Sequence, residues 1–242
     1  MFAAANAIMG ATELETISFA GNHKPFQDEK TEEETMAAAQ LDMPPCQKMA
    51  PLRGTNITDI SSILNAVIFS DAAWSPGHNG EPMPAGIGIY MQICDGRSCS
   101  QLSISAFSPP ASSAIQAEAY GLLLAVKLAE MLKIHQATFL TDNSTLAAAA
   151  AARDPQHKPG HGTIRPQLAG MTASNSFAAA KVFHISRSLN LRAHHHARLA
   201  FKLQNIPFSL RCFGSANRTC LNAEVLSMFC VSQYKLLLVK CC

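Results

Sequence analysis

The chain has 242 residues, of which 48% are hydrophobic, and a formal net charge of +2. This length and apolar content suffice for one sizeable folded domain with extensions, and they exclude a fully disordered protein. The charge is uneven, because residues 1–50 hold eight acidic residues and three lysines, a net of −5, which leaves +7 on the rest. A moderately basic body is compatible with a polyanionic partner but does not require one.

No window reaches the roughly 18 consecutive apolar residues of a membrane span, and residues 1–10 lack the basic start of a secretory signal. We therefore expect no membrane association and an intracellular protein, in the nucleus or cytoplasm and not secreted. The eight cysteines show no CxxC spacing, so reduced thiols are the expected default, although Cys94 and Cys99 flank a hairpin and can approach each other.

The first 60 residues show no sustained hydrophobic period, and we expect an acidic, largely disordered leader with at most a short helix at 31–41. A compact apolar strand is predicted at 65–70, and it leads directly into Asp71. A loop rich in glycine and proline follows.

Two further strands are predicted at 85–93 and 102–107, where apolar residues alternate with small or polar ones. The pair Asp95 and Gly96 between them is typical of a hairpin turn. Three consecutive antiparallel strands are therefore expected.

A helix is predicted from residue 114, because Ser113 and Gln116 have the spacing of a capping box. Glu118 shares a helical face with Leu122 and with later apolar residues. Its carboxylate should therefore point toward a sheet and not toward water.

The run 136–141 is short, β-branched and aromatic, which predicts a strand that ends at Asp142. Together with Asn143, Asp142 also suits the N-cap of the next helix, so capping and metal binding are both open to it. The remaining predicted elements are a helix at 146–152, a helix at 164–177 that Pro166 weakens, a strand at 181–186 and a helix at 192–202.

This order of elements implies an α/β fold with a mixed sheet. The strand ends at Asp71 and Asp142 would be neighbours, with Glu118 above the sheet between them. Three acids that converge on one point repel one another unless cations neutralise them, so the arrangement favours divalent metal ions, and magnesium fits best. Two such ions assist phosphodiester hydrolysis.

Six ordered sequence blocks within residues 65–202 carry a family resemblance: FSDAAW (69–74), AGIGIYM (85–91), AIQAEAYGLLLAV (114–126), FLTDN (139–143), TIRPQLA (163–169) and SRSLNLRAHHHARLA (186–200). These blocks resemble the ribonuclease H domain of the type-1 family, and more closely its reverse-transcriptase-like branch in plant non-LTR retroelements and their host-encoded derivatives. The resemblance implies a five-stranded mixed sheet with helices on both faces, a domain at 65–202 and a C-terminal extension at 203–242 without an assigned role.

The resemblance also implies a site. The family's three metal-binding acids match Asp71, Glu118 and Asp142, and its fourth catalytic position matches His194. Many relatives have aspartate there, whereas this plant-type branch often has histidine. Imidazole binds magnesium less readily than carboxylate does, so His194 would instead move a proton or contact the scissile phosphate, and turnover would be weak. The implied cofactors are two Mg²⁺ ions, with Mn²⁺ as a substitute.

Five residues are candidates for binding nucleic acid, each with an ordinary structural alternative: Trp74, Asn143, Arg187, Asn190 and Arg192. The three consecutive histidines cannot converge on one ion, because successive helical side chains are about 100° apart. His195 and His196 are therefore expected to be exposed or to pack.

The sequence supports two functions. The first is a divalent-metal-dependent endonuclease that hydrolyses the RNA strand of RNA–DNA hybrids. The second is a domesticated ribonuclease H-like module that binds nucleic acid or protein, with weak activity or none. The presence of all three carboxylates favours the enzyme, whereas His194 favours the module.

Overall fold

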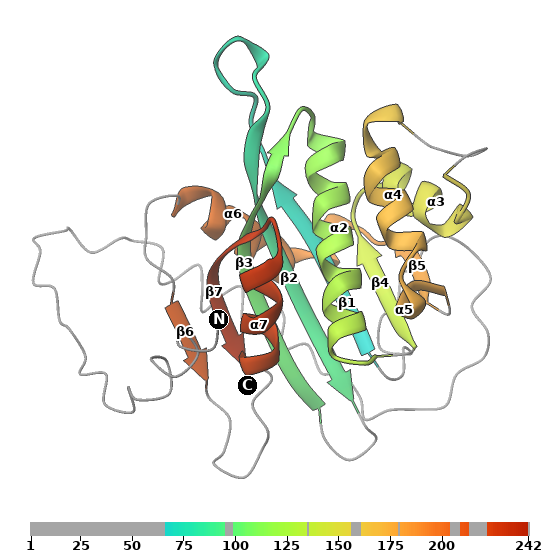
Figure 1. Cartoon of the computed structure of the whole chain (residues 1–242), viewed down its shortest axis with the longest axis vertical. Coiled ribbons are helices and arrows are strands. Elements are labelled where there is room, and N and C mark those ends of the chain that lie inside the picture. Colours follow the sequence, from blue (N-terminus) through green and yellow to red (C-terminus); the bar gives the residue numbers. More distant parts are fainter. Residues whose placement is uncertain are drawn as a thin grey trace, which may run out of the picture. The chain divides into compact units, whose positions relative to one another are not determined.

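The computed structural model of the protein describes residues 66–94, 99–134, 136–155, 161–178, 180–203, 209–212 and 222–241. The predicted leader and the predicted hairpin turn lie outside these residues. In the described part of the chain, the strands form a seven-stranded mixed sheet with helices packed on it (Figure 1). The α/β class predicted from the sequence is therefore confirmed.

The sheet has the order β5-β4-β1-β2-β3-β7-β6. Its strands are β1 (Ala66–Ala73), β2 (Met83–Cys94), β3 (Cys99–Ala111), β4 (Ala137–Thr141), β5 (Lys181–His184), β6 (Ser209–Cys212) and β7 (Lys235–Cys241). The strands β1, β2 and β3 pair antiparallel, as predicted, while β4 pairs parallel with β1 and β5 pairs parallel with β4.

The five strands predicted for the domain at 65–202 are present, and the C-terminal part of the chain adds two more to the sheet. Strand β7 pairs antiparallel with β3, with Leu102 opposite Cys241, and β6 pairs parallel with β7. The apolar finish of the chain thus covers a strand that would otherwise be the edge of the sheet. The sheet extends beyond residue 202, where the resemblance ends.

The helices are α2 (Ala114–Met131), α3 (Ser144–Ala152), α4 (Arg165–Thr172), α5 (Asn175–Ala178), α6 (Leu191–Lys202) and α7 (Asn222–Val231), with 3-10 turns η1 (His78–Gly80), η2 (Gly162–Ile164) and η3 (Arg187–Leu189). The predicted continuous helix at 164–177 is wrong. The segment is instead two short helices, interrupted where Ser174 N donates to Met171 O. None of the described helices combines the length and apolar composition that a membrane crossing requires.

Helices α2 and α6 lie on opposite faces of the sheet, as the side chains of β1 and β2 show, because they point alternately to one face and to the other. Ile68 and Ile87 belong to the hydrophobic cluster that includes Leu122 of α2. The neighbouring residues Val67 and Phe69 point the other way, into the cluster that includes Ala193 of α6. In Figure 1, α2 lies in front of the strands and α6 behind them.

Two glycines of β2 let α6 approach the sheet closely. A Cβ atom at Gly88 would lie 1.9 Å from the carbonyl oxygen of Ala193, and one at Gly86 would lie 2.3 Å from that of Ala197. Such contacts are forbidden, so only glycine permits this docking. The first turns of α6 are thereby held against the strand that pairs with β1.

Cys94 and Cys99 form a disulfide, so the expectation of reduced thiols is wrong for this pair. The two residues stand directly opposite each other on β2 and β3, with Cα atoms 4.2 Å apart. This separation is close to the lower limit at which two cysteines can be bridged. The strand register therefore brings the two sulfur atoms together.

Candidate active site

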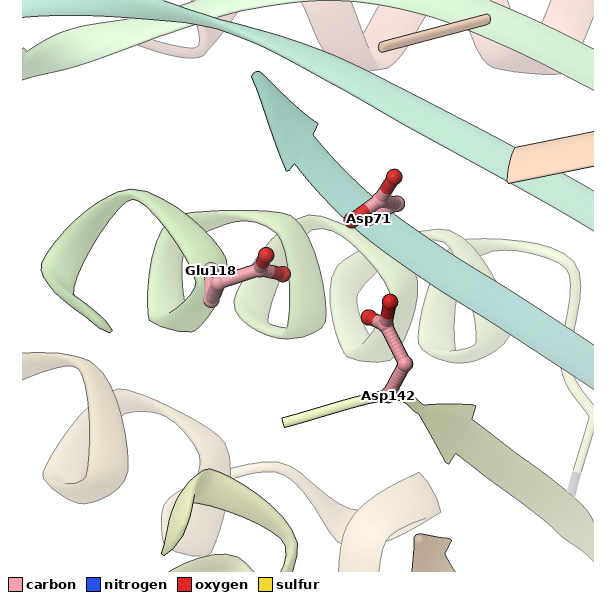
Figure 2. Close-up of side chains that lie close together, drawn as sticks. All are labelled: Asp71, Glu118 and Asp142. Atoms are coloured by element: carbon pink, nitrogen blue, oxygen red, sulfur yellow. The ribbon is translucent and has the colours of Figure 1, made fainter. Parts of the chain in front are cut away.

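Three acids from three different elements meet at one end of the sheet. Asp71 lies within β1 and is paired with Gly88, Glu118 lies in the second turn of α2, and Asp142 directly follows β4. Each offers a ligand oxygen, and these oxygens lie within 4.8 Å of one another. Figure 2 shows the three carboxylates turned toward a common point. The predicted convergence of these acids is present in the structure.

The start of α2 sets the position of Glu118. Ser113 is the N-cap, and its hydroxyl accepts from Gln116 N at 3.3 Å. The reciprocal contact differs from a standard capping box, because Gln116 Oε1 accepts from Ser112 N and not from Ser113 N. The cap places Glu118 one turn into the helix, on the side that faces β1 and β4.

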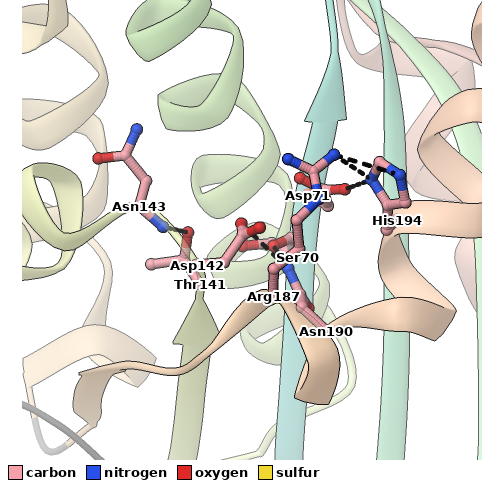
Figure 3. Close-up of polar contacts among 8 residues, drawn as sticks. All are labelled: Ser70, Asp71, Thr141, Asp142, Asn143, Arg187, Asn190 and His194. Carbon is pink, nitrogen blue, oxygen red and sulfur yellow. Dashed lines mark hydrogen bonds and ion pairs between the residues drawn. The ribbon is translucent and has the colours of Figure 1, made fainter.

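Asn143 caps helix α3, which releases Asp142 for the acid cluster. Its Oδ1 atom accepts from Leu146 N at 3.0 Å, and its backbone N donates to Thr141 Oγ1 at 3.2 Å. Figure 3 shows the Asn143 side chain directed away from the acids. Capping and convergence, which the sequence left as alternatives for Asp142, are thus divided between neighbouring residues.

The surroundings of two of the acids disfavour their charged forms. Burial raises the pKa of Glu118 well above its ordinary value, and the charges of Asp71 and Asp142 raise it further. Burial and the nearby Asp142 also raise the pKa of Asp71, which is 3% exposed, while a hydrogen bond from His194 opposes that rise. Glu118 and Asp71 therefore hold protons more tightly than isolated carboxyl groups do.

The donor set suits a hard divalent cation. All three ligand groups are carboxylates, and Glu118 Oε2 is buried with no hydrogen-bond partner among the described residues. An unpaired buried carboxylate oxygen is costly, and a cation would satisfy it. The three acids are therefore compatible with metal binding.

His194, from α6, lies beside Asp71. Its Nδ1 is 2.6 Å from Asp71 Oδ2, and its side chain is 20% exposed. Arg187 Nη2 lies 3.3 Å from Nδ1 and 3.2 Å from Nε2 of the same ring. Figure 3 shows Asp71 and Arg187 each in contact with the His194 ring. With Asp71 ionised, Nδ1 is the donor, because a carboxylate only accepts.

Asn190 lies under the acids and is fully buried. Its Nδ2 donates to Ser70 O at 3.0 Å and to Asp142 Oδ1 at 3.3 Å. The residue immediately precedes α6, and its backbone oxygen accepts from His194 N at 2.9 Å. It therefore connects the two strands with the helix that carries His194.

The other two nucleic-acid candidates make structural contacts. The Trp74 indole packs against the core and donates to Ala111 O at 3.0 Å. The Arg192 guanidinium lies 4.6 Å from the centre of the Tyr90 ring, and it also donates to the Tyr90 hydroxyl and to Gln101 Oε1. Binding of nucleic acid by these residues stays a prediction.

The other two histidines of the run point elsewhere. His195 is exposed, whereas His196 Nδ1 lies 3.0 Å from Ser105 Oγ on the sheet. Burial lowers the pKa of His196 to about 3, and the charges of His195, Lys240 and Arg192 add to this effect. Among these three residues, only His194 reaches the acid cluster.

Sequence reasoning missed the part that Gly88 plays. Gly88 stands opposite Asp71 and permits the close approach of α6 that brings His194 to Asp71. A signal was present, because glycine inside a strand often marks the close approach of another backbone. The alternation of Gly86 and Gly88 along β2 carried that signal.

One protein family and several solved structures are similar to this chain. A family model described as reverse transcriptase-like matches residues 71–200, more than half of the chain. No curated protein matches the chain. The N-terminal RNase H domain of a Mycobacterium tuberculosis protein, solved as a fusion with maltose-binding protein, is 21% identical and covers 57% of this chain and 98% of its own, with a TM-score of 0.45.

Two other solved structures are similar. RNase H1 from the halophilic archaeon Halobacterium salinarum is 19% identical and covers 57% of this chain and 98% of its own, with a TM-score of 0.41. LC11-RNase H1, isolated from compost and solved in complex with an RNA/DNA hybrid, is 20% identical and covers 57% of this chain and 97% of its own, with a TM-score of 0.43.

The matched range begins at Asp71 in β1 and ends in α6, so it contains all three acids and His194. The sheet within this range has three antiparallel strands and two parallel additions with helices on both faces, which is the ribonuclease H-like arrangement expected from the resemblance. The chain belongs to the reverse transcriptase-like family.

Proposed function

We propose that the protein is a divalent-metal-dependent endonuclease that hydrolyses the RNA strand of RNA–DNA hybrids. The observation that carries this proposal is the convergence of ligand oxygens of Asp71, Glu118 and Asp142 within 4.8 Å, with one buried carboxylate oxygen of Glu118 that has no hydrogen-bond partner in the described part of the chain. Structural carboxylates are seldom left in that state without a cation. Membership of the reverse transcriptase-like family supports the same chemistry.

In this proposal the three acids hold two Mg²⁺ ions, for which Mn²⁺ can substitute. When bound, such ions stabilise the attacking and leaving oxygens of phosphodiester hydrolysis and lower the pKa of the attacking water. The raised pKa values of Glu118 and Asp71 mean that these acids must release protons before they bind metal. Metal affinity should therefore increase with pH.

His194 and Arg187 provide polar groups next to Asp71, in addition to the other two acids. His194 assists either by moving a proton through its ring or by contacting the scissile phosphate. Arg187, whose guanidinium lies against that ring, is placed to hold a neighbouring phosphate. Because His194 replaces a carboxylate at the fourth position of the family, we expect turnover to be weak.

The competing function is a ribonuclease H-like module that binds nucleic acid or protein with little cleavage. The close contact between His194 Nδ1 and Asp71 Oδ2 favours it, because the ring engages one of the two carboxylate oxygens that Asp71 can offer to a metal ion. The two functions predict the same fold and differ in whether cleavage depends on the acids.

Purified protein incubated with a labelled RNA–DNA hybrid and Mg²⁺ separates the two functions. Wild type and Asp142→Asn are compared on the hybrid, and single-stranded RNA and duplex DNA serve as substrate controls. We expect cleavage of the RNA strand of the hybrid by wild type only. Equal cleavage by wild type and variant would refute the endonuclease, while binding of the hybrid without cleavage would support the module.

The six sequence blocks and the histidine at the fourth position support placing the chain in the branch found in plant non-LTR retroelements and their host-encoded derivatives. The proposed substrate implies action inside the cell, in the nucleus or cytoplasm. Fractionation of the source cells with an antibody against the chain tests that location.

A further inference from the structure

We propose that Asn190 is a positioning residue, whose buried amide holds the Asp142 carboxylate beside β1 and so sets the geometry in which the acids bind a divalent metal. This inference rests on the proposed function, since it concerns the same acids. It gives Asn190 a role through another residue and not through contact with nucleic acid. Complete burial of the Asn190 side chain favours that assignment.

The amide connects two strands at the place where their own pairing ends. The parallel pairing of β1 with β4 runs to Phe69 opposite Leu140. Beyond that pair, Asn190 Nδ2 donates to Ser70 O at 3.0 Å and to Asp142 Oδ1 at 3.3 Å. One side chain therefore links the residue that precedes Asp71 in β1 to the Asp142 carboxylate at the end of β4.

The chemistry of the two acceptors determines the orientation of the amide. A backbone carbonyl and a carboxylate both accept hydrogen bonds, so the amide nitrogen has to face them, and it carries two hydrogens, enough for both acceptors. The opposite atom, Asn190 Oδ1, is buried without a partner among the described residues. The fold thus leaves one polar atom unsatisfied while it keeps the bond to Asp142.

A second asparagine shows that the bond to Asp142 is specific to position 190. Asn143 and Asn190 both stand at the N-cap of a helix. The Asn143 side chain caps α3 in the ordinary way, whereas the Asn190 side chain makes no cap hydrogen bond with α6. Its amide points away from its own helix and toward Ser70 and Asp142.

The backbone of Asn190 is held on both sides, which makes it a rigid support. Its N donates to Arg187 O at 3.0 Å, within η3, and its carbonyl accepts from His194 N at 2.9 Å, in the first turn of α6. The same residue therefore fixes where Asp142 lies and where the helix that carries His194 begins. Figure 3 shows Asn190 below Asp142, Ser70 and Asp71.

The test measures Mn²⁺ binding by isothermal titration calorimetry and thermal stability in EDTA, both on the full-length chain. The first variant, Asn190→Leu, replaces the amide with an apolar side chain of similar size. The second, Asn190→Ala, is smaller and cannot clash, so its Mn²⁺ affinity tests the inference if the leucine variant does not fold. Gln167→Leu is the matched control. Gln167 is a buried amide, 3% exposed, and in the amide orientation that satisfies its neighbours its nitrogen donates to Thr163 O and Ile164 O, each at 3.2 Å, and not to the acids.

We expect both Asn190 variants to bind Mn²⁺ roughly 10- to 100-fold more weakly than wild type, as is typical when a residue that orients a metal ligand is removed. Gln167→Leu should lose stability and keep wild-type affinity. Hybrid cleavage by Asn190→Ala should recover as the Mn²⁺ concentration rises, whereas Asp142→Asn should stay inactive. If Asn190 had only a structural role, its variants would lose thermal stability, but their Mn²⁺ affinity and the Mn²⁺ concentration needed for cleavage would equal those of wild type.

A folded Asn190 variant that binds Mn²⁺ as tightly as wild type overturns this inference and leaves the proposed function intact. An equal loss of affinity in Gln167→Leu also overturns it, because the effect would then not be specific to Asp142. Wild-type protein that neither binds Mn²⁺ nor cleaves the hybrid overturns the proposed function, and this inference with it.

Discussion

Replacing Glu118 with glutamine is expected to stabilise the metal-free protein near neutral pH. Burial and the charges of Asp71 and Asp142 raise the pKa of this carboxyl group well above its ordinary value. Glutamine has nearly the same shape but carries no charge for burial and its neighbours to penalise. The gain is electrostatic, so it should depend on pH.

The separation of the acids sets the size of the effect. The ligand oxygens of the cluster lie within 4.8 Å of one another, and two full charges at that separation repel by roughly 3.5 kcal/mol at an effective dielectric constant of about 20. Proton uptake by the cluster relieves part of this repulsion. We therefore expect Glu118→Gln to raise the free energy of unfolding by about 2 kcal/mol at about pH 8, or roughly 4–8 °C in melting temperature.

The direction with pH follows from the raised pKa. Below about pH 4, Glu118 is protonated in both the folded and the unfolded chain, so variant and wild type should differ little. As the pH rises, the unfolded chain loses its proton first, and the unfolding free energy of wild type falls by up to about 1.4 kcal/mol per pH unit until the folded-state pKa is passed. The variant lacks this contribution.

Thermal and urea unfolding in EDTA, repeated from about pH 4 to about pH 8, measure this difference. Glu130→Gln is the matched control, because Glu130 is an exposed acid on the same helix, and its replacement should change the stability by less than about 0.5 kcal/mol. Equal stability of Glu118→Gln and wild type at the upper pH would refute the reasoning. So would a gain that persists unchanged at the lower pH.

Gly88→Ala should destabilise the protein by about 3 kcal/mol or more in urea unfolding, because the new Cβ would lie 1.9 Å from a backbone oxygen of α6. Gly162→Ala is the control, because Gly162 has open space around it, and it should change the stability little. Reduction of the Cys94–Cys99 disulfide with dithiothreitol should lower the free energy of unfolding by about 2 kcal/mol. It should leave the Mn²⁺ affinity unchanged, because the disulfide does not contact the three acids, and a changed affinity would contradict this expectation. Asn143→Ala should cost about 1 kcal/mol through loss of the α3 cap, and an unchanged melting temperature would contradict that role.

The three acids were predictable because each follows a local pattern. Asp71 and Asp142 come at the ends of short apolar runs, and Glu118 lies on the apolar face of an amphipathic helix. That Asn143 caps α3 while Asp142 joins the acid cluster was not predictable, since either side chain can cap a helix. The contact of Asp142 with Asn190, which is 48 residues away in sequence, decides it in the folded chain.

The remaining strands and the disulfide depend on pairings that local patterns do not determine. The consecutive leucines of β7 hide its alternation, and its partner β3 is far away in sequence. The sulfur atoms of Cys94 and Cys99 meet only because the register places the two residues directly opposite each other. A shift by one residue would turn one of them to the other face of the sheet.

The pairing of β7 with β3 also affects how the protein is made. It joins residues more than a hundred positions apart, from Leu102 with Cys241 to Phe107 with Lys235. On the ribosome, the acids and α6 emerge before this last strand, so the nascent domain passes through a stage in which β3 has an open edge. An open edge is a template for pairing with another chain. Strand β7, which carries none of the acids, thus sets how long each new molecule is prone to aggregation during synthesis.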